Sequence, residues 1–225
     1  MNTRTMTFQS VRQPLNGYFA KPDGSGPFPA VLIIHELKGL NENIREITRR
    51  FAGEGYAALA VDLFSYRSRA FCLTRFFIGM LTNSLNHEGI QDLKSALNHL
   101  ASLPEVDPTR IGAVGYCLGG SFAIALACAD DRLRVIAPYY AMNPRPMEAV
   151  KRLCPVVGSY PSGDVTTSSG QKLDLELDQY NIPHDIKVYP GAKHSFFNDH
   201  SPATFNQAAS DDSWRRVMAF FKEHI

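Results

Sequence analysis

The fold of this chain is decided by the six residues at 115–120, which read Gly-Tyr-Cys-Leu-Gly-Gly. They follow a short apolar segment at 110–114, typical of a buried strand, and precede a small apolar segment at 118–129, typical of a buried helix. A nucleophilic side chain between two glycines at a strand-to-helix turn is the nucleophile-elbow pattern, here with Cys117 where serine is more common. The glycines are needed because so sharp a turn strains the backbone and leaves no space for neighbouring side chains. The stretch therefore predicts a sheet that carries a nucleophile where one of its strands ends.

The rest of the chain alternates between short apolar segments and longer amphipathic ones. Strands are predicted at 29–35, 56–61, 110–114, 134–137, 155–157 and 185–189. Helices are predicted at 41–53, 90–103, 118–129 and 211–223, the last with Asp211, Asp212 or Ser213 as its N-cap. Strands that are apolar throughout suit a parallel sheet that is covered on both faces. The order of elements thus predicts an α/β fold, a doubly wound and mostly parallel sheet flanked by helices, with ligands at the carboxyl ends of the strands.

One segment, about 64–86, interrupts this alternation with a mixture of aromatic side chains and arginines. We interpret it as a short partial lid over the strand ends. The chain of 225 residues shows no internal repeat and no linker long enough to divide it. A single domain over 1–225 is therefore expected.

Composition argues against several classes of function. The 23 lysines and arginines are balanced by 22 aspartates and glutamates, which argues against a partner made of nucleic acid. The longest apolar run, 122–129, is far shorter than the ~20 residues that a membrane span requires. Residues 1–16 contain no hydrophobic stretch of secretory type. We therefore expect no membrane association and a cytoplasmic location.

The four cysteines form no closely spaced pair and the histidines show no metal-binding spacing, so no metal and no other cofactor is expected. Cys72, Cys128 and Cys154 are interpreted as buried free thiols of a reducing compartment. Cys117 differs, because the helix N-terminus beside it places free N–H groups and a partial positive charge near the sulfur. We expect this placement to favour the thiolate, and we expect the amide of Leu118 to donate to an oxyanion.

A nucleophile at an elbow needs an acid and then a histidine later in the chain. His194 lies in a loop just after the predicted strand 185–189, where this architecture places its base. The other histidines precede the elbow, fall in helical segments or lie outside such a loop: His35, His87, His99, His184, His200 and His224.

Asp164 is the candidate acid, because it follows the predicted strand 155–157 through a glycine turn. An aspartate in such a turn can also be a simple turn residue, which is the alternative. Four other aspartates lie at the end of the elbow helix or on the solvated face of a helical pattern: Asp130, Asp131, Asp174 and Asp178.

Three further motifs accompany the elbow. They are Ile-His-Glu-Leu-Lys-Gly-Leu at 34–40, Ala-Val-Asp-Leu at 60–63 and Lys-His-Ser-Phe at 193–196. With these motifs the chain resembles the dienelactone hydrolase family of α/β-hydrolases, from about Gly17 to the C-terminal helix. The resemblance implies the α/β-hydrolase fold and a hydrolase of esters or lactones that needs no cofactor.

The resemblance also implies roles for individual residues. Cys117, Asp164 and His194 correspond to the catalytic triad of the family. The amide of Leu37 corresponds to the second oxyanion donor, beside that of Leu118.

Glu36 corresponds to the glutamate that modulates the thiol in this family. A carboxylate at the end of a buried strand needs a partner, which would be a cysteine or histidine, or hydrogen bonds that tie down the oxyanion loop. His35 beside it is interpreted as loop scaffolding. The sequence departs from the family four positions after the histidine, where Asn198 replaces an arginine that helps to bind the substrate carboxylate.

The leading hypothesis is a hydrolase of small esters or lactones that works by acyl transfer. Candidate substrate contacts are Arg67, Arg69, Phe76 and Phe196. For the two arginines, the favoured explanation is that they are solvated side chains of the lid segment. The alternative is a non-catalytic protein of the same fold that binds ligands or senses oxidation through Cys117. The expected partner is a small-molecule substrate, and the chain is expected to be a monomer or a weak homo-oligomer.

Overall fold

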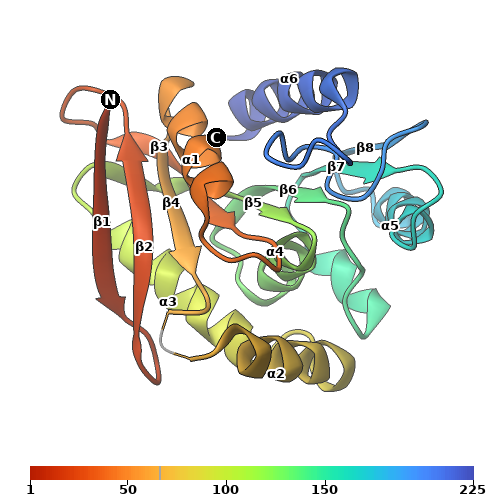
Figure 1. Cartoon of the computed structure of the whole chain (residues 1–225), viewed down its shortest axis with the longest axis horizontal. Coiled ribbons are helices and arrows are strands. Elements are labelled where there is room, and N and C mark those ends of the chain that lie inside the picture. Colours follow the sequence, from red (N-terminus) through yellow and green to blue (C-terminus); the bar gives the residue numbers. More distant parts are fainter. Residues whose placement is uncertain (66) are drawn as a thin grey trace.

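The computed structural model describes residues 1–65 and 67–225. Within these residues, eight strands form one sheet with the order β1-β2-β4-β3-β5-β6-β7-β8 (Figure 1). The strands are β1 (Asn2–Gln9), β2 (Pro14–Lys21), β3 (Phe28–Ile34), β4 (Ala57–Asp62), β5 (Val106–Tyr116), β6 (Leu133–Tyr139), β7 (Val156–Pro161) and β8 (His184–Tyr189). The helices are α1 (Glu42–Gly53), α2 (Arg69–Thr82), α3 (Glu88–Ser102), α4 (Leu118–Ala129), α5 (Thr167–Gln179) and α6 (Gln207–His224), with the short 3-10 helix η1 (Met147–Arg152).

The sheet is mostly parallel, as the sequence predicts. Strands β3 to β8 pair in parallel, whereas β2 is antiparallel to both of its neighbours, β1 and β4. The central strands are buried along nearly their whole length, which explains their continuous apolar sequence. Strands β1 and β2 were not expected, because β1 exposes most of its side chains at the sheet edge and β2 contains Pro14 and Gly17, residues typical of turns.

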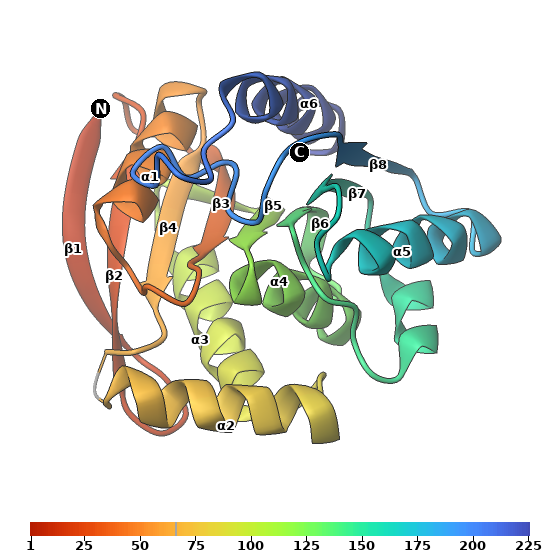
Figure 2. The same ribbon diagram turned by 45° about the vertical axis from the view of Figure 1, so that its right-hand side comes forward.

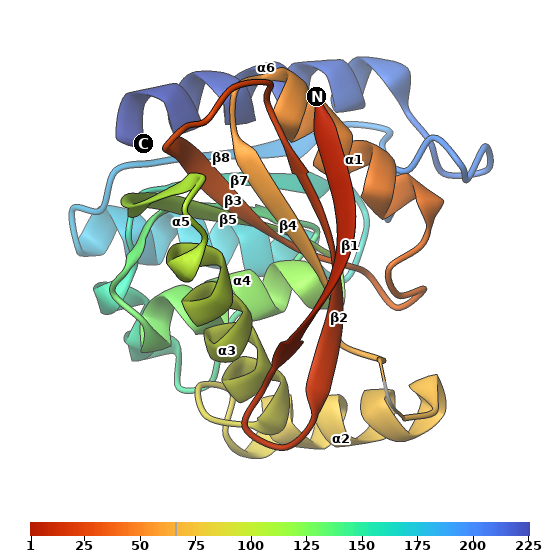
Figure 3. The ribbon, with the colours of Figure 1, turned by 90° about the vertical axis from the view of Figure 1, so that its left-hand side faces the viewer.

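Helices cover both faces of the sheet (Figure 3). On one face, α1 and α6 pack together through the rings of Phe51 and Phe221. On the other face, α3, α4 and α5 form a larger core that includes Leu97, Phe122 and Leu177. The doubly wound arrangement expected from the sequence is therefore confirmed.

The segment 64–86 contains α2, which lies along the margin of the molecule beside α3 (Figure 2). The helix starts after Ser68, whose hydroxyl accepts a hydrogen bond from the amide of Phe71. Its inner side buries Cys72 and Phe76. One residue of the expected lid segment, Tyr66, lies outside the described residues.

The last helix starts earlier than the sequence predicts. Its N-cap is Asn206, whose side-chain oxygen accepts from the amide of Ala209, so that Asp211, Asp212 and Ser213 lie inside the helix. Asp212 has the chemistry of a cap, but its carboxylate is bound instead to the side chain of Lys187 on β8. Tertiary contacts therefore override the local signal.

The carboxyl ends of β3, β5, β7 and β8 meet at one edge of the sheet, and each is followed by a residue of the predicted site. β8 is the last strand of the sheet and pairs only with β7. Across the described part of the chain, every helix is too short or too polar to cross a bilayer.

Candidate active site

Cys117 occupies the turn between β5 and α4. Its φ of 57° and ψ of −116° are a combination that residues with a side chain rarely adopt. A Cβ on Gly115 would lie 2.0 Å from the carbonyl oxygen of Gly119, and a Cβ on Gly119 would lie 2.2 Å from that of Ile34. Both positions therefore require glycine, and the strand–turn–helix geometry of the elbow is as the sequence predicts.

The thiol of Cys117 is not activated by its surroundings at rest. Burial raises the pKa of the thiol to about 11, and the charges of Glu36 and Asp164 act in the same direction. A hydrogen bond from the amide of Leu118 lowers the pKa but does not offset burial. The expectation that the helix N-terminus favours the thiolate is therefore wrong, because one amide and a partial charge do not outweigh desolvation beside two carboxylates. At neutral pH the resting sulfur carries its proton.

Asp164 and His194 meet at the edge of the sheet, as expected of an acid and its base. Nδ1 of His194 lies 3.2 Å from Oδ2 of Asp164. When Nδ1 carries the hydrogen and donates it to the carboxylate, Nε2 remains free to exchange a proton with a reacting group.

The acid is itself held in place by Thr166. Oδ1 of Asp164 accepts from the Thr166 amide at 2.8 Å and from its hydroxyl at 2.6 Å. Burial acts to raise the pKa of Asp164, but these hydrogen bonds and the neighbouring His194 outweigh burial and lower the pKa. Asp164 is therefore ionised at neutral pH and is more than a simple turn residue.

Tyr140, which the sequence did not single out, packs against the base. The ring centres of Tyr140 and His194 are 4.9 Å apart. Tyr140 has a φ of 39° and directly follows β6, so it lies at the same edge as the other site residues. Burial raises the pKa of Tyr140 well above its usual value, and the charge of Glu36 adds to this effect, so the hydroxyl stays neutral. Its position directly after a strand could have revealed Tyr140 as a site residue. The predicted strand, however, ended at residue 137, two residues before β6 ends.

The loop after β3 is fixed by hydrogen bonds around one peptide group. The carbonyl oxygen of Glu36 accepts from Nδ1 of His35 at 2.7 Å and from the amide of Gly39 at 3.1 Å. Nε2 of His35 accepts from the amide of Leu63, so the ring hydrogen is on Nδ1. Burial lowers the pKa of His35, and the neutral ring that results makes both of these hydrogen bonds. Since a trans peptide is planar, fixing the Glu36 carbonyl also fixes the direction of the Leu37 N–H. His35 is thus loop scaffolding, as interpreted from the sequence.

The Glu36 carboxylate is held by two neutral donors. The side-chain amide of Asn198 lies 3.1 Å from Oε1, and the hydroxyl of Ser195 lies 3.3 Å from Oε2. Glu36 is 6% exposed and Asn198 is 4% exposed, so this contact lies inside the molecule. Asn198 therefore points inward to Glu36. Of the two explanations considered for the Glu36 carboxylate, the structure provides hydrogen bonds, and these come from the loop that contains His194.

The two phenylalanines expected to contact substrate are core residues. Phe76 is buried and packs edge-on against the ring of Phe122. Phe196 is fully buried and packs against Tyr140. Phe76 borders a small cavity that none of Cys117, Asp164 and His194 borders, and Phe196 is closed off in the core, so contact of either ring with substrate stays a prediction.

The two arginines expected to contact substrate are exposed near the start of α2. The Arg67 guanidinium lies 5.1 Å from the ring centre of Phe71. It borders a small cavity together with Arg75 and Asp92, and none of the three triad residues borders that cavity. The placement of Arg67 is that of a side chain on the outer surface of the lid segment.

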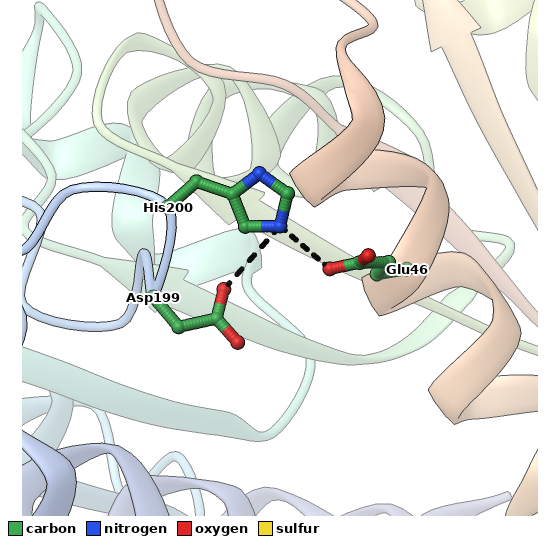
Figure 4. Close-up of side chains that lie close together, drawn as sticks. All are labelled: Glu46, Asp199 and His200. Carbon is green, nitrogen blue, oxygen red and sulfur yellow. Dashed lines mark hydrogen bonds and ion pairs between the residues drawn. The ribbon is translucent and has the colours of Figure 1, made fainter.

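Among the described residues, one group has the donors of a metal site (Figure 4). Nε2 of His200 lies 2.8 Å from a carboxylate oxygen of Glu46 and 3.9 Å from one of Asp199. These donors could hold a metal ion, but all three side chains are exposed and already paired, and Asp199 also accepts from Asn43. These contacts connect α1 to the loop that follows His194, which is sufficient to explain why the three side chains lie together.

Comparison with known proteins gives consistent results. Residues 15–225 match the family model described as the dienelactone hydrolase family. A protein of Saccharolobus solfataricus, provisionally named a carboxymethylenebutenolidase, is 29% identical over 96% of this chain and 96% of its own. A Synechocystis protein with the same name is 25% identical over 100% of this chain and 98% of its own.

Solved structures show the same fold. One provisionally titled a dienelactone hydrolase, from Klebsiella pneumoniae, superposes with a TM-score of 0.84 over 99% of both chains at 24% identity. One titled a dienelactone hydrolase-like promiscuous phosphotriesterase from metagenomic libraries gives a TM-score of 0.88 over 99% of this chain and 98% of its own, at 22% identity. With the family model matched over nearly the whole chain, this protein belongs to the dienelactone hydrolase family.

Proposed function

We propose that this chain hydrolyses small carboxylic esters or lactones by acyl transfer through a triad of Cys117, His194 and Asp164. One observation carries the proposal: the thiol stands at a nucleophile elbow on the same sheet edge as a histidine that is already paired with a carboxylate. Membership of the family supports the reaction class, and two relatives carry the name carboxymethylenebutenolidase, which denotes an enzyme that opens a lactone.

Because the thiol is protonated at rest, acylation begins with proton transfer. Nε2 of His194 takes the proton from the thiol while Sγ of Cys117 bonds to the substrate carbonyl carbon. The carbonyl oxygen becomes an oxyanion that accepts from the amides of Leu37 and Leu118. The carbon–oxygen bond to the leaving group then breaks, and the departing alkoxide takes the proton from His194.

Deacylation repeats these steps with water. His194 takes a proton from water, the oxygen of water bonds to the thioester carbon, and the carbon–sulfur bond breaks. His194 gives this proton to the sulfur, and the product acid releases its own proton to solvent and leaves as a carboxylate. Asp164 keeps the imidazole in one tautomer and stabilises its protonated form in both halves of the reaction.

We also propose that Glu36 modulates the thiol through its charge and its position. Its carboxylate helps to raise the pKa of Cys117, and its backbone carbonyl is part of the hydrogen-bond network that directs the Leu37 amide. A protonated resting thiol is protected from oxidation and from adventitious electrophiles. The same property argues against the redox-sensing alternative, since sensor cysteines have a low thiol pKa.

Hydrolysis of p-nitrophenyl acetate and of a small lactone tests the proposal. Cys117→Ala should lower kcat/KM by at least about a thousandfold, while the buried thiol control Cys72→Ala should keep activity near that of the wild type. A thioester intermediate should be trapped by rapid acid quench and detected by mass spectrometry on the peptide that contains Cys117. Undiminished hydrolysis by Cys117→Ala would refute the acyl-transfer mechanism.

A further inference from the structure

Strand β6 lies in the middle of the candidate site but leads to none of the three residues of the proposed triad. In the sheet it stands between β5, which leads to Cys117, and β7, which leads to Asp164, while β8 and His194 are one strand further along (Figure 1). The residue directly after β6 is Tyr140. Because these strands are parallel, their carboxyl ends meet at one edge of the sheet, and Tyr140 therefore lies among the triad residues.

The backbone of Tyr140 has a conformation that few residues in this protein adopt. Its φ is 39°, and among the described residues other than glycine only three more have a positive φ: Cys117, Asn181 and Ser195. The first of these is the candidate nucleophile and the last directly follows the candidate base. Such conformations are costly and cluster at functional sites, where the surrounding structure enforces them. The backbone thus groups Tyr140 with the residues that carry the chemistry.

Backbone hydrogen bonds on both sides fix this segment. The amide of Tyr140 donates to the carbonyl oxygen of Ser159 on β7 at 2.8 Å. The carbonyl oxygen of the preceding residue, Tyr139, accepts from the amide of Cys117 at 3.0 Å. The segment therefore connects the strand that leads to the acid with the turn that holds the nucleophile. These two contacts also fix the direction in which the Tyr140 side chain leaves the backbone.

The ring of Tyr140 extends this connection to the base. Tyr140 is buried, and its ring packs edge-on against that of Phe196, with the ring centres 5.5 Å apart. The centres of the Tyr140 and His194 rings are 4.9 Å apart, and the two planes meet at 53°. The half-buried imidazole is thus held by Asp164 at Nδ1 and by Tyr140 at its ring.

A neutral aromatic ring beside a histidine has its largest effect when the histidine is charged. The Tyr140 hydroxyl stays neutral, because burial and the charge of Glu36 raise its pKa well above the usual value. The face of such a ring is negative and attracts a cation that lies within about 6 Å of the ring centre. In the proposed reaction His194 becomes a cation twice. It first carries a proton from the thiol to the departing alkoxide, and then one from water to the sulfur.

We propose that Tyr140 is a positioning residue for the base: its ring holds the His194 imidazole beside Asp164 and stabilises the imidazolium that forms in both halves of the reaction. This inference rests on the proposed function. Tyr140 itself neither gives nor takes a proton. Because its ring acts on His194 rather than on the substrate, loss of the ring should lower kcat and leave KM nearly unchanged.

Steady-state hydrolysis of p-nitrophenyl acetate by Tyr140 variants tests the proposal. Tyr140→Phe keeps the ring and should retain kcat within about twofold. Tyr140→Leu removes the ring and should lower kcat by about three- to thirtyfold, with KM changed by less than about twofold. The matched control is Tyr56→Leu, which removes a buried ring that packs against Phe51 and Phe221 just before β4, at the opposite edge of the sheet. Its kcat per folded molecule should match that of the wild type.

Two further variants show whether Tyr140 acts through the base. If it does, Tyr140→Leu should cause no additional loss in a protein that already carries His194→Ala, whereas damage to the elbow or to the fold would still slow that protein. Replacement of Tyr140 by pentafluorophenylalanine keeps the shape of the ring but reverses the charge of its face. Its kcat should therefore fall at least about twofold below that of Tyr140→Phe. This replacement also tests the proposal if Tyr140→Leu does not fold.

Four results would overturn the proposal. They are a folded Tyr140→Leu with the kcat of the wild type, a Tyr140→Phe as slow as Tyr140→Leu, a loss that persists in the His194→Ala protein, and a pentafluorophenylalanine variant as fast as Tyr140→Phe. Failure of the proposed function would differ from all of these, because Cys117→Ala or His194→Ala would then still hydrolyse the ester.

Discussion

Cys117 stands where an α-helix begins, yet its sulfur holds its proton more tightly than a free cysteine does. The sequence supplies the helix N-terminus, which acts to lower the pKa of the thiol. Only the folded chain supplies the burial and the charges of Glu36 and Asp164, which raise it. The sequence therefore predicts Cys117 as the nucleophile of the proposed reaction and places it at the elbow, whereas the protonation state of its thiol depends on the fold.

The first prediction concerns this thiol. Since the pKa of Cys117 is about 11, the thiolate fraction, and with it the rate of alkylation by iodoacetamide, should rise about tenfold per pH unit from pH 7 to about pH 10. Cys117 should be labelled before Cys128 and Cys154, because burial raises the pKa of both to about 12. Peptide mapping after partial labelling at each pH measures both effects. A labelling rate that levels off near pH 8 would contradict the protonated resting state.

The second prediction concerns the base and its acid. His194→Ala removes the proton carrier and should lower kcat/KM by at least about a thousandfold. Asp164→Asn leaves the imidazole in place but misorients it, and should cost less, although still at least about a hundredfold. Steady-state kinetics on a small ester measures both losses.

Asp174 provides the control for the acid. Its carboxylate lies 3.3 Å from Nε2 of His184, the first residue of β8, and so lies near the amino ends of the strands rather than the carboxyl ends that carry the candidate site. Asp174→Asn should therefore leave turnover unchanged. If this variant were inactive and Asp164→Asn active, the acid would have to be reassigned.

At the scale of elements, the strand–turn–helix unit formed by β5 and α4 was the most predictable part of the molecule. Its glycines, its apolar helix and its nucleophile are all local signals. The cap of α6 was less predictable, because Asp212 and Asn206 have the same local chemistry and only the contact of Asp212 with β8 distinguishes them. The local sequence predicts where a helix or strand begins and ends when its residues make no competing contacts with distant parts of the chain.

The third prediction concerns α4. A methyl group on Gly119 would lie 2.2 Å from the carbonyl oxygen of Ile34, so Gly119→Ala should force α4 away from β3. We expect a loss of at least about 3 kcal/mol in the free energy of unfolding, together with loss of activity. Gly53→Ala at the end of α1 is the matched control: a Cβ there meets nothing within 4 Å, and stability should stay unchanged or rise by about 0.5 kcal/mol. Urea unfolding followed by circular dichroism distinguishes the two.

At the scale of the whole molecule, the sheet and its two covered faces followed from the alternation of apolar and amphipathic segments. The antiparallel hairpin of β1 and β2 did not, because an exposed edge strand has no continuous apolar run to reveal it. Cys117, Asp164 and His194, the members of the proposed triad, could be expected at one edge of the sheet because each follows a predicted strand. The sequence shows that Asn198 replaces an arginine. It does not show the contact of Asn198 with Glu36, because these two residues are distant in the sequence and meet only in the fold.

The fourth prediction concerns substrate charge. Asn198 is neutral and committed to Glu36, so it contributes no fixed positive charge for a substrate carboxylate. A charge-assisted hydrogen bond contributes about 1.5–3 kcal/mol, or about ten- to a hundredfold in kcat/KM. Anionic substrates should therefore gain less than tenfold (about 1.4 kcal/mol) over neutral analogues. Arg67→Ala and Arg69→Ala should change this ratio little, because Arg67 borders a cavity that neither Cys117, Asp164 nor His194 borders. The measurement compares a carboxylate substrate with its methyl ester; a strong preference that survives both substitutions would contradict this model of the pocket.

The position of β8 at the end of the sheet has a consequence for the order in which activity and structure are lost on unfolding. His194 follows a strand that has one neighbour and half-exposed side chains, held to α6 by the contacts of Arg216 with Asp185 and Tyr189. Edge elements open more easily than a core does. With rising urea concentration, ester hydrolysis should therefore be lost before the far-ultraviolet ellipticity. Arg216→Ala should widen the interval between the midpoints of these two transitions. Coincident midpoints in both proteins would show that this edge opens only when the whole sheet unfolds. Loss of hydrolysis should thus report the opening of this edge of the sheet before the rest of the fold is lost.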